Sequence, residues 1–468
     1  MGALAGCAAP LPKLTPPLPA QWQHAIASNP AKPTDLHGWW HAFGDPELNT
    51  LVDRALARNL DVAQAVQRLR ASRTMDRHAH ARFLPALSAR TNDAVDPDAT
   101  ASYFVAGFDA SWELGMFGRS EGVRRVSQGD LNARAADLQA ARVSLVAEVV
   151  REWIDLRAAQ KQEQLLLKIS RARHRQWQLL QVRQRLQLVP PMTVDQAQAA
   201  YAEAEAALAA PRQAINASAQ RLAVLLAQNH PDPAWLEPGR QPELGAWQLD
   251  DAPAELLRTR PEIAQAEAQV LNAAGELDLA NANLYPSVGL GASLVWSAQV
   301  INNRKFSQSP NGIASIGPLL NIPLFDWGMR LAAKHARGYE LQASLLAYRQ
   351  AVLKGVAEVE TALGSLGQQA QREDHSLAAW KALQHAEKAL QTRVGLHLGS
   401  PLAGIDGQVA ADQAAIALAD ARAAHSLAYV ALFKALGGAP LPKGDAPKAP
   451  ARASSPVAST ADSGKAMH

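Results

Sequence analysis

Two short stretches of the chain alternate between apolar positions and small or polar ones. In residues 104–114 the even positions are apolar or alanine, and most odd positions are polar or glycine. Residues 288–296 repeat this pattern, with glycine or serine at most odd positions. A period of two over about ten residues predicts β-strands with one apolar and one polar face. The same alternation is typical of a transmembrane β-strand and of a half-buried antiparallel sheet, and both interpretations stay open on the pattern alone.

In the membrane interpretation, the lipid-facing candidates are the large apolar side chains at the even positions. They are Phe104, Phe108, Trp112, Leu290, Leu294 and Trp296. Turns are expected at Asp96-Pro97-Asp98 and in the polar loop 302–311, which gives two hairpins and four strands. Four strands cannot close a barrel. A membrane interpretation therefore requires several copies of the chain.

The rest of the chain is predicted to be helical. Two moderate helices are expected over 46–82 and 254–284, each ended by a proline, and two very long ones over 119–189 and 327–398. A further helix is expected to end each half, over 193–228 and 406–436. The first long stretch contains no proline, so about seventy residues would extend over roughly 100 Å. Helices of this length must pack side by side as coiled coils.

The pattern of elements occurs twice, and four short matches support a tandem duplication. Residues 61–65 match 262–266, and residues 83–85 match 284–286, both at an offset of 201. Residues 114–117 match 322–325 at an offset of 208, and residues 146–149 match 356–359 at an offset of 210. The order is kept while the offset changes little, which is the expected result of duplication followed by small insertions. This period is far longer than the units of ordinary solenoids.

Composition favours slender, closely packed helices. Hydrophobic residues make up 48% of the 468 residues but aromatic residues only 5%, and much of the apolar share is alanine. Alanine is the best helix former and allows helices to approach closely. The net charge of +3 gives no basic footprint, so no nucleic-acid partner is expected. We expect no apolar run of about 20 residues, and hence no inner-membrane transporter.

The only cysteine, Cys7, lies in the segment Leu4-Ala5-Gly6-Cys7. This segment resembles the lipobox of bacterial lipoproteins, in which the thiol receives a covalent lipid after signal cleavage. Only six residues precede Cys7, whereas a secretory signal needs an apolar stretch of about 7–15 residues. We therefore expect either a translation start upstream of Met1 or a truncated chain. The alternative is a chance cysteine in a flexible terminus.

The sequence offers no catalytic set and no cofactor site. It contains neither a glycine-rich phosphate loop nor a second thiol. His37 and His41 have the spacing of two metal ligands on a helix, but they follow a proline-rich leader and have no acidic residue between them. We therefore expect no metal site and no enzyme activity.

Four segments carry a family resemblance. They are Trp39 to Leu48, Ser111 to Arg119, Arg260 to Ile263, and Gly317 to Asp326. In this order they resemble the TolC-like outer membrane factors, in the lipoprotein-type branch that includes the NodT proteins. The resemblance covers residues 39 to 438. It implies a mixed, mainly α fold in a homotrimer, with four strands per chain in a twelve-stranded outer-membrane barrel above a periplasmic helical tunnel.

The resemblance also implies a function, partners and a location. The chain would be a lipid-anchored exit duct for small molecules in the outer membrane of a Gram-negative bacterium. Its partners would be a periplasmic adaptor and an inner-membrane pump. One alternative is a duct for secreted protein in type I secretion. Another, from a different class, is a periplasmic adaptor or coiled-coil scaffold.

The two helix-hairpin tips depart from the family pattern. The first tip, 189–195, lacks the usual glycine and serine, and the second, 399–406, is expected to be one residue longer. Asp195 and Asp406 are candidates for a periplasmic gate, because the family narrows its duct with acidic residues there. For Asp195 a structural role is favoured, since Thr193 and Gln196 fit a capping box. For Asp406 a gate and a helix start stay equally open.

The expected organisation has six parts. They are a residual lipobox (1–7), an extended proline-rich leader (8–35), a first repeat (36–230), a linker (231–250), a second repeat (251–438) and a disordered tail (439–468).

Overall fold

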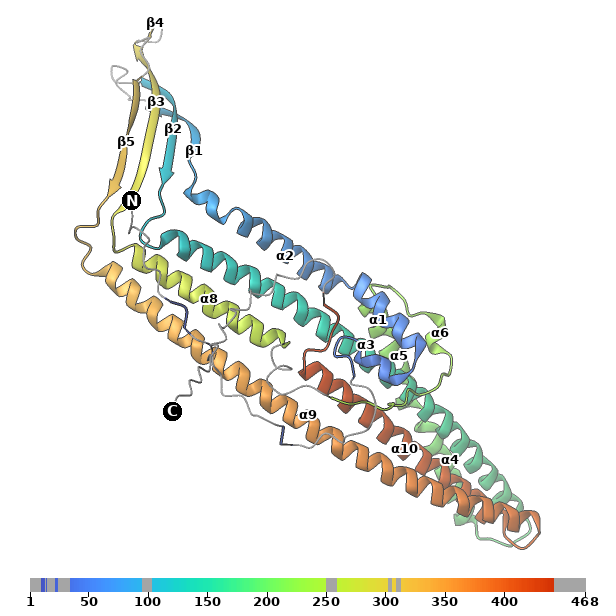
Figure 1. Cartoon of the computed structure of the whole chain (residues 1–468). Helices are drawn as coiled ribbons and strands as arrows, with labels where there is room; N and C mark the ends of the chain where they lie inside the picture. The colour runs from blue at the N-terminus through green and yellow to red at the C-terminus, as the bar shows by residue number, and fades with distance from the viewer. Residues whose placement is uncertain are drawn as a thin grey trace, which may run out of the picture.

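The computed structural model describes residues 10–12, 14, 22–23, 34–94, 103–249, 259–301, 305–308 and 313–441. The molecule is elongated, with a β-sheet at one end and two helical hairpins at the other (Figure 1). The expected lipobox at Cys7, most of the leader and nearly all of the tail lie outside the described residues. So does the boundary between the linker and the second repeat.

The sheet contains β1 (Ala86–Ala94), β2 (Tyr103–Glu113), β3 (Ser287–Ile301), β4 (Lys305–Gln308) and β5 (Ile313–Asn321). All pairs are antiparallel, in the order β1-β2-β3-β5, and β4 pairs with the far end of β3. Four long strands were expected and are found. The expected loop 302–311 is wrong in part, because β3 continues to Ile301 and β4 pairs with that extension. The predicted turn at Asp96 to Asp98 lies outside the described residues.

Two helices of 67 residues each run the length of the helical region. They are α3 (Arg119–Arg185) and α9 (Met329–Gly395), and each extends over about 100 Å, as expected. Both begin after a glycine with a left-handed backbone, Gly118 at φ 85° and Gly328 at φ 80°. The predicted stretches were a few residues too long at their ends, because each helix ends at the turn that reverses the chain.

The shorter helices are more divided than the sequence indicated. The predicted helix 46–82 is α1 (Pro46–Arg58), α2 (Leu60–Arg77) and the 3-10 turn η2 (Ala79–Phe83). Asn59 breaks it: its Oδ1 accepts hydrogen bonds from the backbone N–H groups of Asp61 and Val62, and its Nδ2 donates to the carbonyl of Leu225. An asparagine at the N-cap position starts a new helix in this way.

The other short helices are α4 (Pro191–Ala206), α5 (Ala209–Leu225), α6 (Pro233–Leu236), α8 (Pro261–Ala282) and α10 (Pro401–Ala435). The predicted helix 193–228 is thus two helices, and the one predicted from 406 begins earlier, at Pro401. The reason is a proline at the first helical position of both α4 and α10, where its fixed φ favours the helix. By length and hydropathy α10 could cross a membrane, contrary to expectation, but half of its most apolar stretch is buried within the chain.

Helices α8 and α10 lie one after the other between α3 and α9 (Figure 1). Helices α2, α5 and α4 lie against the other side of α3. The approach of α3 to α8 is close: a Cβ atom on Gly129 would lie 2.8 Å from the backbone N of Asn272. A buried ion pair of 2.8 Å between Arg125 and Asp278 joins the same two helices.

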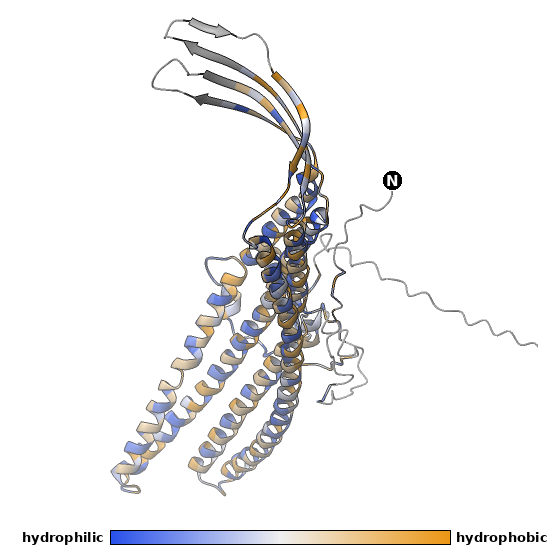
Figure 2. Cartoon of the chain, turned by 90° about the vertical axis from the view of Figure 1, so that its left-hand side faces the viewer, coloured by the Kyte–Doolittle hydropathy of each residue, from blue (hydrophilic) through white to orange (hydrophobic). Residues whose placement is uncertain are grey.

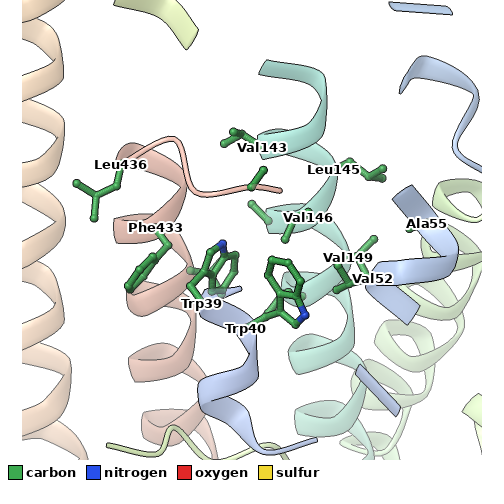
Figure 3. Close-up of a cluster of buried hydrophobic side chains, with 14 of the residues drawn as sticks. Trp39, Trp40, Val52, Ala55, Val143, Leu145, Val146, Val149, Phe433 and Leu436 are labelled. Atoms are coloured by element: carbon green, nitrogen blue, oxygen red, sulfur yellow. The ribbon is translucent and has the colours of Figure 1, made fainter. Parts of the chain in front are cut away.

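A cluster of buried aromatic residues ties both ends of the chain to α3 near its middle (Figure 3). Trp39, in the 3-10 turn η1 (Trp39–Phe43), stacks on Phe433 of α10 with ring centres 5.6 Å apart. Its indole N–H donates to the carbonyl of Gly438, and the hydroxyl of Tyr429 donates to the carbonyl of Trp39. The segment that opens the family resemblance therefore forms the core of the molecule.

The duplication is visible in the backbone as well. Phe117 and Trp327 both have φ 55°, and Gln187 and His397 both have φ 58°. Both pairs are related by the same sequence offset of 210. The match of Phe117 with Phe325, at an offset of 208, is therefore wrong: the equivalent of Phe117 is Trp327, since both precede the glycine that starts a long helix.

Candidate functional site

The sheet has one apolar and one polar face, because the strand register keeps the even positions of β2 and β3 together. Phe108 lies opposite Leu294, and Trp112 lies opposite Leu290. Directly opposed residues of an antiparallel pair point to the same face. In β5, Leu320 and Ile316 continue this apolar face, since they oppose Val288 and Ala292.

The predicted lipid-facing residues lie on this one face, as their positions in the strands require. The side chains of Phe108, Trp112, Leu290 and Trp296 are between 38% and 47% exposed, and Leu294 is half-buried. Phe108 and Trp296 contact each other edge to face, with ring centres 6.1 Å apart. Phe104 lies in β2, and its side chain is outside the described part of the structure.

The opposite face carries polar groups that bond to one another. Arg90 of β1 forms an ion pair of 3.1 Å with Asp109 of β2, and the hydroxyls of Ser293 and Ser315 are 2.8 Å apart. Polar side chains thus satisfy each other on one face while large apolar ones are exposed on the other. Such a sheet is built to separate an apolar phase from a polar one.

Both outer strands of the sheet have a free edge within the described residues. Strand β1 pairs with β2 and β5 pairs with β3, so the outer edges of β1 and β5 present unpaired backbone groups (Figures 1 and 2). Free strand edges are ready to pair with another chain. The exposed apolar residues Leu324, Phe325 and Trp327 follow β5 directly, at 89%, 75% and 88% exposure.

The helical hairpins end in two turns of the same construction. Leu188 donates its backbone N–H to the carbonyl of Arg183, and Leu398 donates to that of Arg393, again at an offset of 210. The expectation that the second tip is one residue longer is therefore wrong. In consequence, Asp195 is equivalent to Ile405, and Asp406 is equivalent to Gln196.

Asp195 does not lie in a capping box, contrary to prediction. The N-cap of α4 is Pro190, which makes no side-chain hydrogen bond, and Asp195 is an exposed residue of the second turn. Asp406 is the sixth residue of α10, so the alternative in which it starts the helix is wrong.

The carboxylate of Asp406 bonds across to the other hairpin. Its Oδ1 lies 3.3 Å from Nη1 of Arg173 and 3.1 Å from Nε2 of Gln176, both on α3. Its side chain is 57% exposed, so solvent weakens this ion pair. The structure therefore joins Asp406 to α3, whereas Asp195 is an exposed residue of α4. Arg173 and Gln176 were not predicted, because no local pattern relates positions that lie in opposite halves of the sequence.

The two histidines with metal-ligand spacing have different partners. Nδ1 of His37 lies 2.7 Å from the carbonyl of Ala439, and Nδ1 of His41 lies 2.8 Å from Oδ1 of Asn49. Across the described ranges, no three His, Cys, Asp or Glu side chains are grouped to hold a metal ion.

Comparison with known proteins gives consistent matches along the chain. The sequence profile of the outer membrane efflux protein family matches twice, at residues 51–228 and 252–438. The pyoverdine export outer membrane protein OpmQ of Pseudomonas aeruginosa is 29% identical over 458 residues, which cover 90% of this chain and 91% of that protein. Nodulation protein T of Rhizobium leguminosarum bv. trifolii is 25% identical over 379 residues, 78% of this chain and 79% of that protein.

Solved structures agree with the fold. The outer-membrane channel OprN superposes with a TM-score of 0.76 at 27% identity, covering 93% of this chain and all of OprN. The open state of the MtrE channel of Neisseria gonorrhoeae gives 0.77 at 24% identity, covering 92% of this chain and 98% of MtrE, and supports the fold alone. Together with the two-faced sheet and the duplicated hairpins, these matches show that the chain belongs to the outer membrane efflux protein family.

Proposed function

We propose that this chain is the passive exit duct of a tripartite efflux system, and that it acts as a homotrimer in the outer membrane. Small molecules would pass from an inner-membrane pump, through a periplasmic adaptor, into the duct. The observation that carries the proposal is the two-faced sheet with free outer edges. In lipid every backbone polar group must be satisfied, so the free edges of β1 and β5 require another copy of the chain.

Internal duplication indicates how the copies would meet. Within the chain, the second strand of the first half (β2) pairs with the first strand of the second half (β3). The same relation between chains pairs β5 with β1 of the partner subunit. The register of β1 on β2 is the same as that of β3 on β5. Strand β1 corresponds to β3 at an offset of 201 residues, and β2 corresponds to β5 at an offset of 210. Adding 210 to Ser111 and subtracting 201 from Gly291, which face each other in β2 and β3, gives the equivalent pair between chains. This pair is Asn321 opposite Arg90 of the partner subunit.

The same relation accounts for the exposed aromatic residues after β5. Within the chain, Phe117 of the first half stacks on Tyr285 of the second half, with ring centres 5.1 Å apart. Its equivalent, Trp327, is 88% exposed, and the equivalent of Tyr285 is Leu84, which is 52% exposed. Burying Trp327 on Leu84 of the partner subunit would remove both apolar side chains from water, which favours assembly.

The number of copies follows from the width of a duct. Two chains would give eight strands, and an eight-stranded barrel is just wide enough for its own side chains to fill. Three chains give twelve strands, so three is the smallest number of copies whose barrel is wider than this. The polar face with Arg90, Asp109 and Ser293 would then line this lumen, and the face with Phe108 and Leu290 would contact lipid.

Cysteine pairs test the arrangement of copies. In a Cys7→Ser background, Arg90→Cys with Asn321→Cys places two thiols opposite each other only between chains. We expect oxidation to give a ladder of cross-linked chains that ends at three on a non-reducing gel. Ser88→Cys with Asn321→Cys lies two residues out of register and is the matched control. A ladder ending at two, or efficient linkage in the control alone, would contradict the trimer.

An arginine scan tests the lipid face. Phe108→Arg or Leu290→Arg should cost roughly 2–4 kcal/mol if the residue lies near mid-membrane, whereas Ser111→Arg on the polar face should be tolerated. Outer-membrane assembly and the unfolding temperature of the extracted protein measure the difference. Equal tolerance at both kinds of position would show that the apolar face does not contact lipid.

The anchor stays a prediction. If translation starts upstream of Met1, Cys7 becomes the acylated first residue of the mature chain. Because Ala8 rather than aspartate follows it, we expect sorting to the outer membrane. Mass spectrometry of the mature N-terminus from the native host decides this point: an unmodified Cys7 contradicts it.

We further propose that Asp406 contributes to the periplasmic gate. Its ion pair with Arg173 links the two hairpins of one chain close to the tip, where a trimer would bring three copies around one axis. Opening would then require this link to break as the second hairpin moves away from the first.

A further inference from the structure

Helices α3 and α8 meet around a buried cluster of charges. Nη1 of Arg125 on α3 lies 2.8 Å from Oδ2 of Asp278 on α8, and Nε of Arg125 lies 2.9 Å from Oε1 of Glu121. The side chains of Arg125 and Asp278 are 9% and 6% exposed. Two carboxylates therefore balance the buried guanidinium, which is the condition under which a protein interior tolerates such a charge.

Glycines allow the two helices to approach this closely. A Cβ atom on Gly122 of α3 would lie 3.0 Å from the carbonyl O of Gly275, and a Cβ on Gly275 of α8 would lie 2.7 Å from the backbone N of Val126. One turn further along α3, Gly129 approaches α8 in the same way. The two backbones are thus in contact around the charge cluster, and no space remains between them.

The proposed homotrimer makes the same kind of contact a second time, between copies. Strand β5 pairs with β1 of the partner subunit as β2 pairs with β3 within the chain. The helices attached to these strands then lie alongside in the same way, α9 beside α2 of the partner subunit as α3 beside α8. An offset of 210 relates α3 to α9, and an offset of 201 relates α2 to α8.

The charge cluster has a different composition in the contact between copies. In place of the glutamate and the arginine of α3, helix α9 has Leu331 and His335. In place of the aspartate of α8 lies Arg77 of the partner subunit. Both carboxylates are thus replaced, one by an apolar side chain and one by a second basic group. Arginine stays protonated in proteins, so its charge needs an anion that neither helix supplies at these positions.

The carboxylates nearest in sequence are bound within their own chain. Asp76 of α2 accepts a hydrogen bond of 3.0 Å from the hydroxyl of Ser127 on α3. Glu340 of α9 accepts one of 2.7 Å from Arg337, which also forms an ion pair of 3.4 Å with Glu276 of α8. These acidic groups therefore already have cationic or hydroxyl partners.

The contact between copies must also be wider than the one within the chain. At the three glycine positions it has Ala332, Tyr339 and Thr74 of the partner subunit. Because even a Cβ at the glycine positions would lie within 3.0 Å of the facing backbone, α9 cannot approach α2 of the partner subunit as closely as α3 approaches α8. The larger separation leaves room beside His335 that the contact within the chain does not have.

This position is close to the sheet. His335 lies six residues after Met329, the first residue of α9, and hence about 9 Å along the helix from the end that faces the strands. In the proposed duct the sheet spans the membrane, so this end of the helices would lie beside the phosphate-bearing headgroups of the lipid. A further basic residue, His78 of the partner subunit, follows in sequence on the facing helix.

On the basis of the homotrimer proposed above, we propose that each contact between copies binds one phosphate group, held by His335 on one side and by Arg77 of the partner subunit on the other. The phosphate takes the place that the Asp278 carboxylate has within the chain. Its oxygens accept two parallel N–H groups from the guanidinium and one from the imidazole. A trimer has three such sites, and neither copy forms one alone. The phosphate belongs to a phospholipid headgroup or is free inorganic phosphate.

Calorimetry on the full-length protein tests the site, in an uncharged detergent and a buffer without phosphate. The probes are inorganic phosphate, dihexanoyl phosphatidylglycerol below its micelle concentration, and dihexanoylglycerol, which has the same chains without the phosphate. We expect both phosphate probes to bind and dihexanoylglycerol not to bind. Affinity at least about tenfold higher for the lipid than for inorganic phosphate would identify a headgroup as the ligand, and equal affinity would identify the free ion.

Single variants locate the binding. Arg77→Gln and His335→Gln should each weaken the binding of both phosphate probes by about tenfold or more. Both residues are exposed in the single chain, so neither change should impair its folding. Arg68→Gln is the matched control: it removes another exposed arginine of α2, whose equivalent in α8, Gln269, is also exposed, and it should leave the binding unchanged.

A double variant supplies the missing carboxylate. Arg77→Asp with His335→Arg recreates between copies the pair that Asp278 and Arg125 form within the chain, so it should bind no phosphate. The temperature at which the parent trimer dissociates should rise when phosphate is added, because a ligand that binds only the assembled form stabilises it. The same temperature should not change with phosphate in the double variant.

Light scattering separates a failure of the site from a failure of the duct. A trimer that binds neither phosphate probe, or that binds them as tightly after Arg77→Gln, would overturn the site and leave the proposed duct unaffected. A protein that stays monomeric after extraction would overturn both. Equal binding of dihexanoylglycerol and the lipid would show a site for acyl chains in place of one for phosphate.

Discussion

Helices α3 and α9 have the same length, begin after equivalent glycines and end in equivalent turns, yet they differ strongly in burial. Twenty-three residues of α3 are buried and only seven of α9. Among the described elements, α3 packs against α2, α4 and α5 as well as against α8 and α10, whereas α9 packs mainly against α8 and α10, which lie on one side of it. Its other side exposes Leu331, Tyr339, Leu346 and Leu353. The difference shows that burial here depends on which elements lie alongside, and in the proposed homotrimer the exposed side of α9 would face a second copy of the chain.

The largest expected effect concerns the close packing of α3 on α8. Gly129→Val would drive a side chain into backbone atoms of α8, since even a Cβ would lie 2.8 Å from the N of Asn272 and 2.9 Å from the O of Ala268. We expect a loss of about 3 kcal/mol or more in the free energy of unfolding. The equivalent position on α9 is Tyr339, which is 69% exposed, so Tyr339→Val should leave the fold of a single chain unchanged. Thermal unfolding of the detergent-extracted proteins compares the two, and equal losses would contradict the contrast.

A second pair of variants separates folding from assembly. Phe117→Ser removes a half-buried ring that stacks within the chain, and we expect a loss of about 1–3 kcal/mol in the free energy of unfolding, seen as a lower unfolding temperature. Trp327→Ser removes the equivalent ring, which is exposed, and should weaken assembly without lowering the stability of the single chain. Light scattering after size-exclusion chromatography measures assembly. A Trp327→Ser protein that assembles as well as the parent would show that this residue does not lie between copies.

For variants at the hairpin tips we expect a smaller loss of stability than for the two pairs of variants above, and a larger effect on transport. Asp406→Asn removes one ion of an exposed pair, so we expect less than about 1 kcal/mol in stability. In planar bilayers, it should lower cation selectivity and change conductance, because the link to Arg173 is lost. Asp195→Asn, at an exposed and non-equivalent position, should do less. Unchanged conductance with Asp406→Asn would contradict a role in the gate.

The smallest expected effect is the pH dependence of stability that the half-buried carboxyl of Asp412 on α10 contributes. Burial raises the pKa of Asp412 above its ordinary value, so its ionised form opposes folding at neutral pH. This unfavourable contribution disappears as the pH falls below the raised pKa, since the carboxyl is then protonated in the folded state. Asp412→Asn should therefore be slightly more stable than the parent at pH 7, and the difference should shrink toward pH 4. Thermal unfolding at both pH values checks this, and a difference that grows toward pH 4 would contradict it.

Much of the fold could be predicted because its main patterns are local. The alternation over 104–114 and 288–296 located β2 and β3, and the absence of proline after Arg119 predicted the length of α3. The breaks that were missed depend on distant contacts or on single residues. Asn59 ends α1 partly through the carbonyl of Leu225, far away in sequence, and Pro191 and Pro401 start their helices earlier than the predicted starts at Thr193 and Asp406.

The candidate site was predictable only where a face of an element forms it. The apolar face of the sheet follows from a period of two, so Phe108, Trp112, Leu290 and Trp296 could be placed together from the sequence. The link between Asp406 and Arg173 joins two helices whose register along each other is set by the whole packed layer. No local pattern encodes that register, and the equivalence of Asp406 with Gln196 became visible only from the matching turns.

Helices α3 and α9 both have 67 residues, so each half of the chain sets the same distance between the sheet and its hairpin tip. Any change in the distance between the sheet and the tips must be made in both halves at once. An insertion in one long helix alone would place the tip of its hairpin beyond the tip of the other hairpin. A heptad added to α3 alone would displace that tip by about 10 Å, and the contact of Asp406 with Arg173 would be lost. In chains of this kind, a different distance between the sheet and the tips is therefore expected to result from insertions of equal length in both long helices, each a whole number of heptads.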